Sequence, residues 1–363
     1  MKFRIEKTAL LNGIQTVQNV ITAKSALPIL SNILMEAQPS NLRLTATDLD
    51  IGISCVLPVN TQEAGVITIP AKRLGDIIKE LPADSVSIGT KKNNQVTIET
   101  ESCQFKIMGL SSEEFPKLPE FKNKEAIKVD QGVLKQMFAL TAFAVSFDET
   151  RYILNGILLK IEKNNLLLVA TDGKRLAVVE RKLKQTIEKE VRVIVPIKTI
   201  HELNRNLKED GELSIVFSNN QALFDLGQVV IISRLIDGEF PDYKQVIPPA
   251  AESKMFINRT QFLLAVKRAA LLSTPDYQAV KFELFKDRLV ISKSTPDIGE
   301  SREELTVEYR GKEFAIGFNP AYIIDVLKNL QEEKIAFELT DSDKPGVVRI
   351  DGYVYIVLPM RLG

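Results

Sequence analysis

The chain has 363 residues, which is beyond the size at which one hydrophobic core stops growing and predicts two or three domains. Its 45% hydrophobic and 26% charged residues, with 18 Gly and 16 Pro, are typical of an ordered protein and argue against long disorder. Lys plus Arg and Asp plus Glu number 47 each, so the formal net charge is zero. This balance argues against tight nucleic-acid binding by phosphate neutralisation, unless basic residues gather on one surface.

The sequence gives no indication of a membrane or secreted protein. Its longest apolar runs, such as Ile51–Leu57 and Val191–Val195, have the length of strands and are too short to span a bilayer. The segment Met1–Glu6 alternates charged and apolar residues, unlike a signal peptide, so we expect a cytoplasmic protein. Cys55 and Cys103 each lie in an apolar, strand-like context, which predicts two buried thiols and no disulfide.

The first third of the chain is predicted to be a helix, several strands, a second helix and further strands. Leu10 and Ile14 belong to an apolar stripe at helical spacing, and Leu74 and Ile78 belong to a second stripe that follows Pro70. The alternating or apolar runs between and after these helices predict strands. These runs are Ile29–Met35, Leu42–Asp48, Val66–Ile69, Ser85–Ile88 and Gln95–Ile98.

The middle third repeats this order. A helical stripe includes Leu134 and Met137, and a later one includes Ile200 and Leu203. Between them, Leu166–Asp172 (LLLVATD) repeats Leu42–Asp48 (LRLTATD) after a little over 120 residues. The other matching runs are Ile153–Ile161 and Val193–Pro196, which are predicted strands, and Phe240–Tyr243, which matches Phe115–Leu118.

The last third carries a more divergent third copy. Phe262 and Val266 mark its first helix, and Ile323 and Leu327 mark its second. Asn319 before Pro320 predicts an N-cap followed by proline in the first turn. The predicted strands are Val280–Phe285, Asp287–Lys293, Phe314–Phe318 and Val347–Ile350, with Asp287–Lys293 aligned to Leu42–Asp48.

We therefore predict an α+β protein built from three tandem copies of one domain, each with two helices and antiparallel strands. The predicted boundaries are 1–122, 127–250 and 254–363. Basic residues on the predicted helices are candidates for a positively charged surface, although acidic residues such as Asp76 and Glu202 lie on the same helices, and solvated helix faces are commonly Lys-rich. The basic residues are Lys72, Arg73, Lys79, Lys135, Lys198, Arg205, Arg259, Lys267, Arg268 and Lys328.

Over its whole length the sequence resembles the β subunit of bacterial DNA polymerase III, the sliding clamp. Its most specific matching runs are Leu27–Leu30, Arg151–Gly156, Ala170–Ala177, Asp237–Tyr243 and the C-terminal Pro359–Leu362. The resemblance implies a non-catalytic processivity factor of the replicative polymerase without cofactors. It implies a head-to-tail homodimer that forms a closed ring around double-stranded DNA, with helices inside and sheets outside.

A size estimate supports the dimer if helices line the hole. Helices about 10 Å across leave roughly 9 Å clear when six form a circle and roughly 28 Å when twelve do. A duplex is on the order of 20 Å across, with grooves about 8 Å deep, so only the twelve-helix ring admits it. Contacts to phosphate would then be loose and screened by salt, which makes the zero net charge intelligible.

The resemblance also implies three sets of site residues. A groove between the second and third domains would capture short peptide motifs of polymerases, the clamp loader and repair proteins. Its matching positions are Leu154, Thr171, Gly173, Lys174, Arg175, Leu176, Pro241, Val246, Tyr277, Asn319, Tyr322, Pro345, Val357, Pro359, Met360, Arg361 and Leu362. The implied DNA contacts include Lys24 and Tyr152, and the helix residues Lys72, Arg73, Lys79, Lys198, Arg205 and Lys267 would face DNA. The implied dimer contact joins Phe105 and Ile107 to Leu271 and Leu272 of the other chain; all four are also consistent with core positions.

Some positions depart from the family pattern. Lys174 stands where its best-known members have His, Gln245 where they have Arg, and Asp148 where a neutral amide is familiar. Because Thr47–Leu49 corresponds to Thr171–Gly173, the Thr-Asp turn itself is predicted to be structural, with glycine supplying a positive φ. Gly173 and Arg175 are then the departures that indicate function.

Two other functions remain open at this point. A metal-dependent nuclease could use paired carboxylates such as Asp48 and Asp50, but the repeat explains Asp48 better as a turn residue. The single histidine, His201, has no nucleophile motif nearby, and no phosphate-binding loop motif is present, so an enzyme is disfavoured. The second alternative is a peptide-binding scaffold that never encircles DNA.

Overall fold

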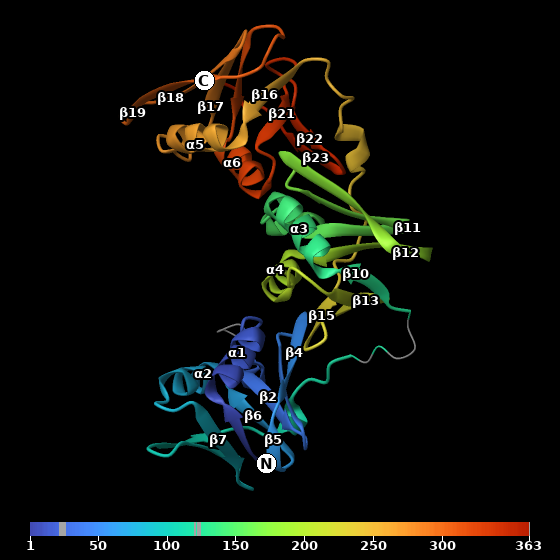
Figure 1. Cartoon of the computed structure of the whole chain (residues 1–363), viewed down its shortest axis with the longest axis vertical. Helices are drawn as coiled ribbons and strands as arrows, with labels where there is room; N and C mark the ends of the chain where they lie inside the picture. The colour runs from blue at the N-terminus through green and yellow to red at the C-terminus, as the bar shows by residue number, and fades with distance from the viewer. Residues whose placement is uncertain (22–26, 120, 122–124, 363) are drawn as a thin grey trace. The chain divides into compact units, whose positions relative to one another are not determined.

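A computed structural model describes residues 1–21, 27–119, 121 and 125–362 (Figure 1). The chain divides into two compact units. One consists of Met1–Gly132 and Lys198–Leu235, and the other of Val133–Ile197 and Ile236–Gly363. In the described residues, no helix combines the length and the apolar character that crossing a membrane requires.

The first unit contains two antiparallel sheets, of strand order β5-β1-β7-β8-β9 and β10-β13-β14-β15-β4-β3-β2-β6. Its helices are α1 (Lys7–Gln18), α2 (Ala71–Glu80) and α4 (Ile197–Asn206), with short 3₁₀ turns η1 (Pro28–Ser31) and η2 (Ser112–Glu114). Its strands are β1 (Lys2–Glu6), β2 (Asn32–Ala37), β3 (Asn41–Thr47), β4 (Ile51–Pro58), β5 (Asn60–Glu63), β6 (Gly65–Pro70), β7 (Ser85–Thr90), β8 (Gln95–Glu99), β9 (Gln104–Met108), β10 (Ile127–Asp130), β13 (Glu212–Ser218), β14 (Gln221–Asp225) and β15 (Val229–Arg234).

The second unit has sheets of order β11-β12-β23-β22-β21-β16 and β19-β18-β17-β20. Its helices are α3 (Gln131–Thr141), α5 (Arg259–Ala270) and α6 (Pro320–Asn329), with 3₁₀ turns η3 (Ala142–Ala144), η4 (Glu149–Leu154) and η5 (Tyr243–Val246). Its strands are β11 (Gly156–Thr171), β12 (Arg175–Pro196), β16 (Lys254–Asn258), β17 (Val280–Phe285), β18 (Arg288–Thr295), β19 (Gly299–Thr306), β20 (Phe314–Phe318), β21 (Lys334–Glu338), β22 (Gly346–Ile350) and β23 (Tyr353–Val357).

The helices bury their apolar stripes, as the sequence periodicity predicts. Leu10 and Ile14 of α1 and Leu74 and Ile78 of α2 are fully buried. In the third repeat, Phe262 of α5 lies edge-on to a phenylalanine of β17 and is part of a cluster of four rings. Burying such side chains stabilises each domain by roughly 1.5–3 kcal/mol per residue. The α+β domains with antiparallel sheets are confirmed.

Several predicted local features are confirmed. The side chain of Asn319 caps α6 by accepting from the backbone N–H of Ala321 at 3.0 Å, and Pro320 occupies the first turn. Val280–Phe285 is strand β17. Cys55 is buried and neither cysteine forms a disulfide.

Three local predictions are wrong in detail. Residues 29–31 form the 3₁₀ turn η1, since proline opens it, and strand β2 begins only at Asn32. Residues 153–154 likewise belong to η4, and β11 begins at Gly156. Cys103 is only half-buried because it lies in the turn before β9, where its backbone carbonyl accepts from the N–H of Thr100 at 2.9 Å.

The alignment of the third copy to the first is shifted by two residues from the predicted one. Leu34 pairs with Thr68, three residues before α2, and Lys281 pairs with Gly317, three residues before α6, so Leu34 corresponds to Lys281. On their other sides, Leu34 pairs with Thr45 and Lys281 with Ser292. Thr45 therefore corresponds to Ser292, whereas aligning Asp287–Lys293 with Leu42–Asp48 would assign it to Val290. Eleven positions separate the paired residues in each hairpin, so the two turns have the same length and only the sequence alignment was shifted.

Candidate functional site

The turn between β11 and β12, with the residues that flank it, carries four of the predicted site residues. The Thr171 hydroxyl donates to the Arg175 carbonyl at 2.6 Å and accepts from the Gly173 N–H at 3.1 Å. The Asp172 carboxylate accepts from the N–H groups of Lys174 and Arg175 at 2.8 and 3.0 Å. Gly173 has φ +85°, in the left-handed region that glycine tolerates best.

The first repeat has the same turn with one strained residue. Thr47 and Asp48 make the corresponding hydrogen bonds, to Leu49, Asp50 and Ile51. Leu49 has φ 80°, where a side chain costs roughly 1–2 kcal/mol. The prediction that the Thr-Asp turn is structural is confirmed, and glycine in the second copy relieves its strain.

Arg175 follows this turn, and its side chain is surrounded by polar and aromatic groups. The side chain is only 9% exposed. Its Nε donates to Asp172 at 3.0 Å and its Nη1 donates to Asp325 of α6 at 2.7 Å. The guanidinium carbon lies 4.3 Å from the ring centre of Tyr322 and 5.5 Å from that of Phe143. Burial opposes the charge, but the hydrogen bond that Arg175 donates to Asp325 and the nearby carboxylates raise the pKa of Arg175 above its ordinary value. Arg175 thus joins the second repeat to the third and has little surface left for a ligand.

Strand pairing holds the same two repeats together. Arg175 pairs with Val357, and the pairing of β12 with β23 continues to Val179 and Tyr353. The Tyr355 hydroxyl donates to the Tyr322 carbonyl at 2.9 Å. Burial of Tyr355 raises the pKa of its hydroxyl, so it stays protonated and acts only as a donor and acceptor at neutral pH.

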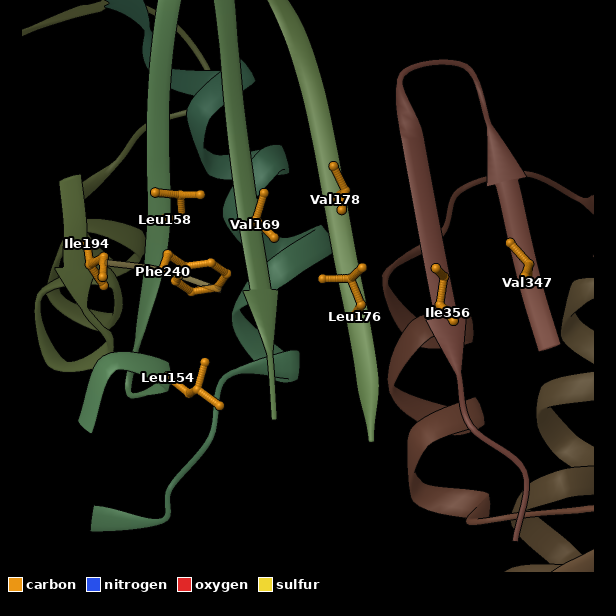
Figure 2. Close-up of a cluster of buried hydrophobic side chains, with 9 residues drawn as sticks. All are labelled: Leu154, Leu158, Val169, Leu176, Val178, Ile194, Phe240, Val347 and Ile356. Carbon is orange, nitrogen blue, oxygen red and sulfur yellow. The ribbon is translucent and has the colours of Figure 1, made fainter. Parts of the chain in front are cut away.

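On the other face of these strands lies an apolar cluster (Figure 2). Figure 2 shows the ring of Phe240 beside Leu158 and Val169, with Leu154 and Leu176 nearby. The remaining buried members are Val178, Ile194, Val347 and Ile356, and Tyr243 and Ile247 pack against them. Close to this cluster in sequence, Pro241 is exposed and Val246 is 59% exposed.

The C-terminal tail runs along both repeats. The Leu358 N–H donates to the Lys174 carbonyl at 2.9 Å, and the Met360 N–H donates to the Gly317 carbonyl at 2.8 Å. Met360 is half-buried, while Arg361 and Leu362 are exposed. Tyr277 is 51% exposed and lines one cavity together with these three tail residues. Tyr277 thus lies beside three predicted tail residues, and Lys174 lies beside Leu358.

Three family models match consecutive parts of the chain. They describe the N-terminal, central and C-terminal domains of the DNA polymerase III beta subunit and match residues 1–119, 128–242 and 244–361. The chain belongs to the DNA polymerase III β subunit family, the sliding clamps.

Curated relatives and solved structures agree with this membership over the full length. The beta sliding clamp of Pseudomonas aeruginosa is 35% identical, with all of both chains covered, and that of Chlamydia muridarum is 32% identical, with 100% of this chain and 99% of the relative covered. The crystal structure of the Bacillus subtilis sliding clamp superposes with a TM-score of 0.95 at 31% identity and full coverage of both chains. A fold of three tandem clamp domains follows, as predicted.

Some of the predicted DNA-facing residues of this clamp form ion pairs with acidic side chains, and others are exposed to solvent. Lys24 lies outside the described residues. Lys198 forms an ion pair with Asp48, and Arg205 forms one with Glu202. The remaining members, Lys72, Arg73, Lys79 and Lys267, are exposed on their helices, and Tyr152 is 57% exposed.

The loop before Tyr152 contains an acid that is locally compensated. Asp148 accepts from the Arg151 Nε at 2.9 Å and from the Thr150 hydroxyl at 2.6 Å. These hydrogen bonds hold the pKa of Asp148 below its ordinary value. Its neighbour Phe147, which the sequence analysis did not single out, is 73% exposed.

The predicted dimer residues lie at surfaces. Phe105 and Ile107 are on β9, which is at the edge of its sheet, and they share a face because they pair with Ile98 and Val96 of β8. Phe105 is 40% exposed. Leu271, directly after α5, is 81% exposed, whereas Leu272 is half-buried.

Asp325, the partner of Arg175 on α6, was not among the predicted site residues. A signal was available, since Asp76, Glu202 and Asp325 each occupy the sixth position of the second helix of a repeat. Acidic residues on a helix face of mixed charge do not reveal a partner that is distant in sequence. These three acids were therefore interpreted only as part of solvent-exposed helix faces.

Proposed function

We propose that this sliding clamp acts as a processivity factor in the form of a head-to-tail homodimer, whose two chains close a ring around duplex DNA. Such a ring retains DNA by topology and leaves it free to slide, which agrees with the equal numbers of basic and acidic residues. The proposal needs no catalytic residue and no cofactor, and it places the protein with DNA in the cytoplasm. The observation that carries it is the way in which each repeat joins the next.

The first and second repeats are joined by strand pairing and by one ion pair. Strand β4 pairs with β15 from Ile51 opposite Ser233 to Cys55 opposite Val229. Asp48, in the turn before β4, binds Lys198 in the first turn of α4. A strand that follows a Thr-Asp turn thus meets the last strand of the next repeat, and the turn meets that repeat's second helix.

The second and third repeats repeat this arrangement. Strand β12 follows the turn that contains Asp172 and pairs with β23, the last strand of the third repeat. The turn reaches α6 through Arg175 and Asp325. Two junctions of the same kind indicate a general rule for how these repeats associate.

Two strands, β9 and β19, are not used in these two junctions. Strand β19 follows the corresponding turn of the third repeat, and β9 is the last strand of the first; each lies at a sheet edge. A single antiparallel bridge follows the last strand of each repeat, at Leu110 after β9, Ile236 after β15 and Met360 after β23. In every repeat the bridge partner lies three positions before the second helix. Strand β9 therefore corresponds to β15 and β23. Exposed strand edges are templates for pairing with another chain. We therefore propose that β9 of one chain pairs antiparallel with β19 of the other.

The same correspondence predicts the register of this intermolecular sheet. Thr45 corresponds to Ser292, as shown above. Thr45 pairs with Ser54 and Ser292 pairs with Arg302, so Ser54 corresponds to Arg302. Ser54 also pairs with Val230, six residues before Ile236, and the residue six before Leu110 is Gln104. Arg302 then lies opposite Gln104. Two residues along, the acidic Glu300 lies opposite the basic Lys106, a favourable cross-strand pair worth roughly 0.2–1 kcal/mol.

An aromatic contact inside the chain supports the apolar part of this interface. Phe143, shortly after α3, has its ring centre 5.7 Å from that of Tyr355 on β23. By the correspondence above, Tyr355 matches Phe105, and Leu272 lies at the place after α5 that Phe143 occupies after α3. The exposed Phe105 and Leu271 are therefore expected to become buried when two chains associate.

We propose further that the cluster around Leu154, Leu176 and Pro241, together with Tyr322 and the tail from Pro359, is a groove for short peptide motifs of polymerases, clamp loader and repair proteins. The exposed Val246 and Tyr277 and the apolar cluster beneath support an apolar slot with few polar anchors. In this proposal Arg175 supports the wall of the groove without contacting the peptide. We also propose that the domain boundaries lie near residues 122–127 and 250–254. Lys72, Arg73, Lys79, Lys198, Arg205, Lys267, Lys24 and Tyr152 are proposed to face DNA.

Topological retention can be tested with nicked circular DNA. The protein is loaded by a clamp loader, the DNA is linearised on half of the sample, and both halves are passed through a sizing column. Protein that stays with circles and leaves linear DNA supports the ring. Equal retention on both forms would contradict it and favour binding by affinity.

A further inference from the structure

The third repeat contains a cavity of about 850 Å³ beside the tail. It is lined by residues 276–279, by strands β17, β18 and β19, and by Met360, Arg361 and Leu362. Tyr277 and these three tail residues also belong to the proposed peptide groove. The cavity therefore shares four lining residues with the proposed groove.

Positive charge predominates in the lining. The two acids are Asp276 and Glu300, and the four bases are Lys281, Lys293, Arg302 and Arg361. Lys281 and Arg302 are partly neutralised by neighbouring Glu283 and Glu304, at 2.8 and 2.7 Å, but these pairs are exposed and weak. In the proposed dimer, Lys106 of a second copy would lie opposite Glu300 and increase the excess of positive charge.

Lys293 is the unusual member because it is 95% buried. Its ammonium group donates to the backbone carbonyls of Tyr277 and Ala279 at 2.7 and 2.9 Å. No carboxylate among the described residues lies within ion-pair distance of it, and burial lowers its pKa. The group thus fixes the segment that carries Tyr277 and places a charge at the cavity that no acid of the described chain neutralises.

We propose that this cavity binds acidic residues that flank the apolar core of a partner peptide. The inference rests on the proposed groove and deepens it, because it assigns a charge preference to the sequence next to the motif. Charge complementarity and the four lining residues shared with the groove favour this occupant over an apolar one. Specificity among partners would then depend on their flanks as well as on their motifs.

The test uses fluorescein-labelled tail peptides of the replicative polymerase in a fluorescence-polarisation assay on the full-length dimer. One peptide carries three added Asp residues, a second carries three Asn residues, and each extension is placed at either end in turn. At 50 mM NaCl we expect the Asp extension at one end to tighten binding about five- to tenfold over Asn, and the gain to fall below about twofold at 0.5 M NaCl.

Variants locate the effect. Lys281→Gln and Arg302→Gln are expected to remove most of the Asp gain while leaving the affinity for the Asn peptide unchanged. Arg288→Gln is the matched control, since Arg288 also pairs with Glu304 but does not line the cavity. Equal affinities of Asp and Asn peptides for the wild type, or equal effects of Arg288→Gln and Arg302→Gln, would overturn the inference. Failure of the unextended peptide to bind would instead overturn the proposed groove, and the inference with it.

Discussion

Replacing Asp325 by Asn tests the link between Arg175 and α6. The change keeps the side chain's shape and one acceptor but removes the charge that lies 2.7 Å from the Arg175 Nη1. Two unit charges about 4 Å apart interact by about 4 kcal/mol at an effective dielectric constant of 20, which is an upper bound here. Because Arg175 is 9% exposed and Asp325 33% exposed, we expect a loss between the values for exposed and buried pairs, about 1–2 kcal/mol.

The assay is native-state amide hydrogen exchange. A loss of 1–2 kcal/mol in local opening energy corresponds to roughly five- to thirtyfold faster exchange in α6 and β23. Asp48→Asn is the matched control at the first junction, since its partner Lys198 is 41% exposed, so a smaller effect, below about 1 kcal/mol, is expected in α4. Both Asn variants retain a side-chain oxygen, so differences in packing are small.

A double-mutant cycle isolates the pair. Arg175→Met alone leaves two carboxylates without their cation, and adding Asp325→Asn removes one of them, so the double variant should lose less than the sum of the single losses. Additive losses, or unchanged exchange in α6 of Asp325→Asn, would refute the reasoning that this ion pair joins the two repeats.

Three further predictions concern other elements. Leu272→Glu should give monomers in sedimentation velocity at micromolar concentration, and a dimer of unchanged stability would contradict the proposed interface. Gly173→Ala should destabilise the second unit by about 1–2 kcal/mol in thermal melting, because an alanine at φ +85° is strained and its Cβ would lie 3.0 Å from Arg151. Burial raises the pKa of Glu202 despite Arg205, so the native state binds its proton more tightly than the unfolded chain and its ionisation reduces stability as pH rises above about 4.5. Glu202→Gln should therefore melt at a higher temperature than wild type at pH 7 and show a smaller advantage near pH 4; a constant difference would contradict this assignment.

The periodic parts of the fold could be predicted from sequence. Helical stripes such as that of Leu10 and Ile14 and the Asn319 cap depend on neighbouring residues only, and both are confirmed. The shifted alignment of the third copy could not be corrected from sequence, because strand register depends on pairing between distant residues. For the same reason the position of Thr45 relative to Ser292 required the sheet ladders.

For the site, the sequence indicated the position of Arg175 but not its role. Its departure from the first repeat, which has Ile51 there, was interpreted as contact with a ligand. The structure instead surrounds the guanidinium with Asp172, Asp325 and two rings. A lone basic residue after a turn carries no information about an acid 150 residues away, and only the packing of β12 beside α6 reveals the pair.

The two junctions solve one geometric problem with different chemistry, and this difference bears on function. The first uses Asp48 with the partly exposed Lys198, a flexible point charge, whereas the second uses Arg175, whose planar fork binds two carboxylates and stacks on Tyr322. An arginine that donates to two carboxylates and stacks on a ring is fixed in orientation as well as in distance. The more rigid junction lies where the proposed peptide groove is formed by two repeats, and a groove of this kind keeps its shape only if the repeats do not rotate against each other. The substitution Arg175→Lys keeps the charge but loses the planar fork. We therefore expect a clear loss of affinity for a partner peptide and only a small fall in the melting temperature.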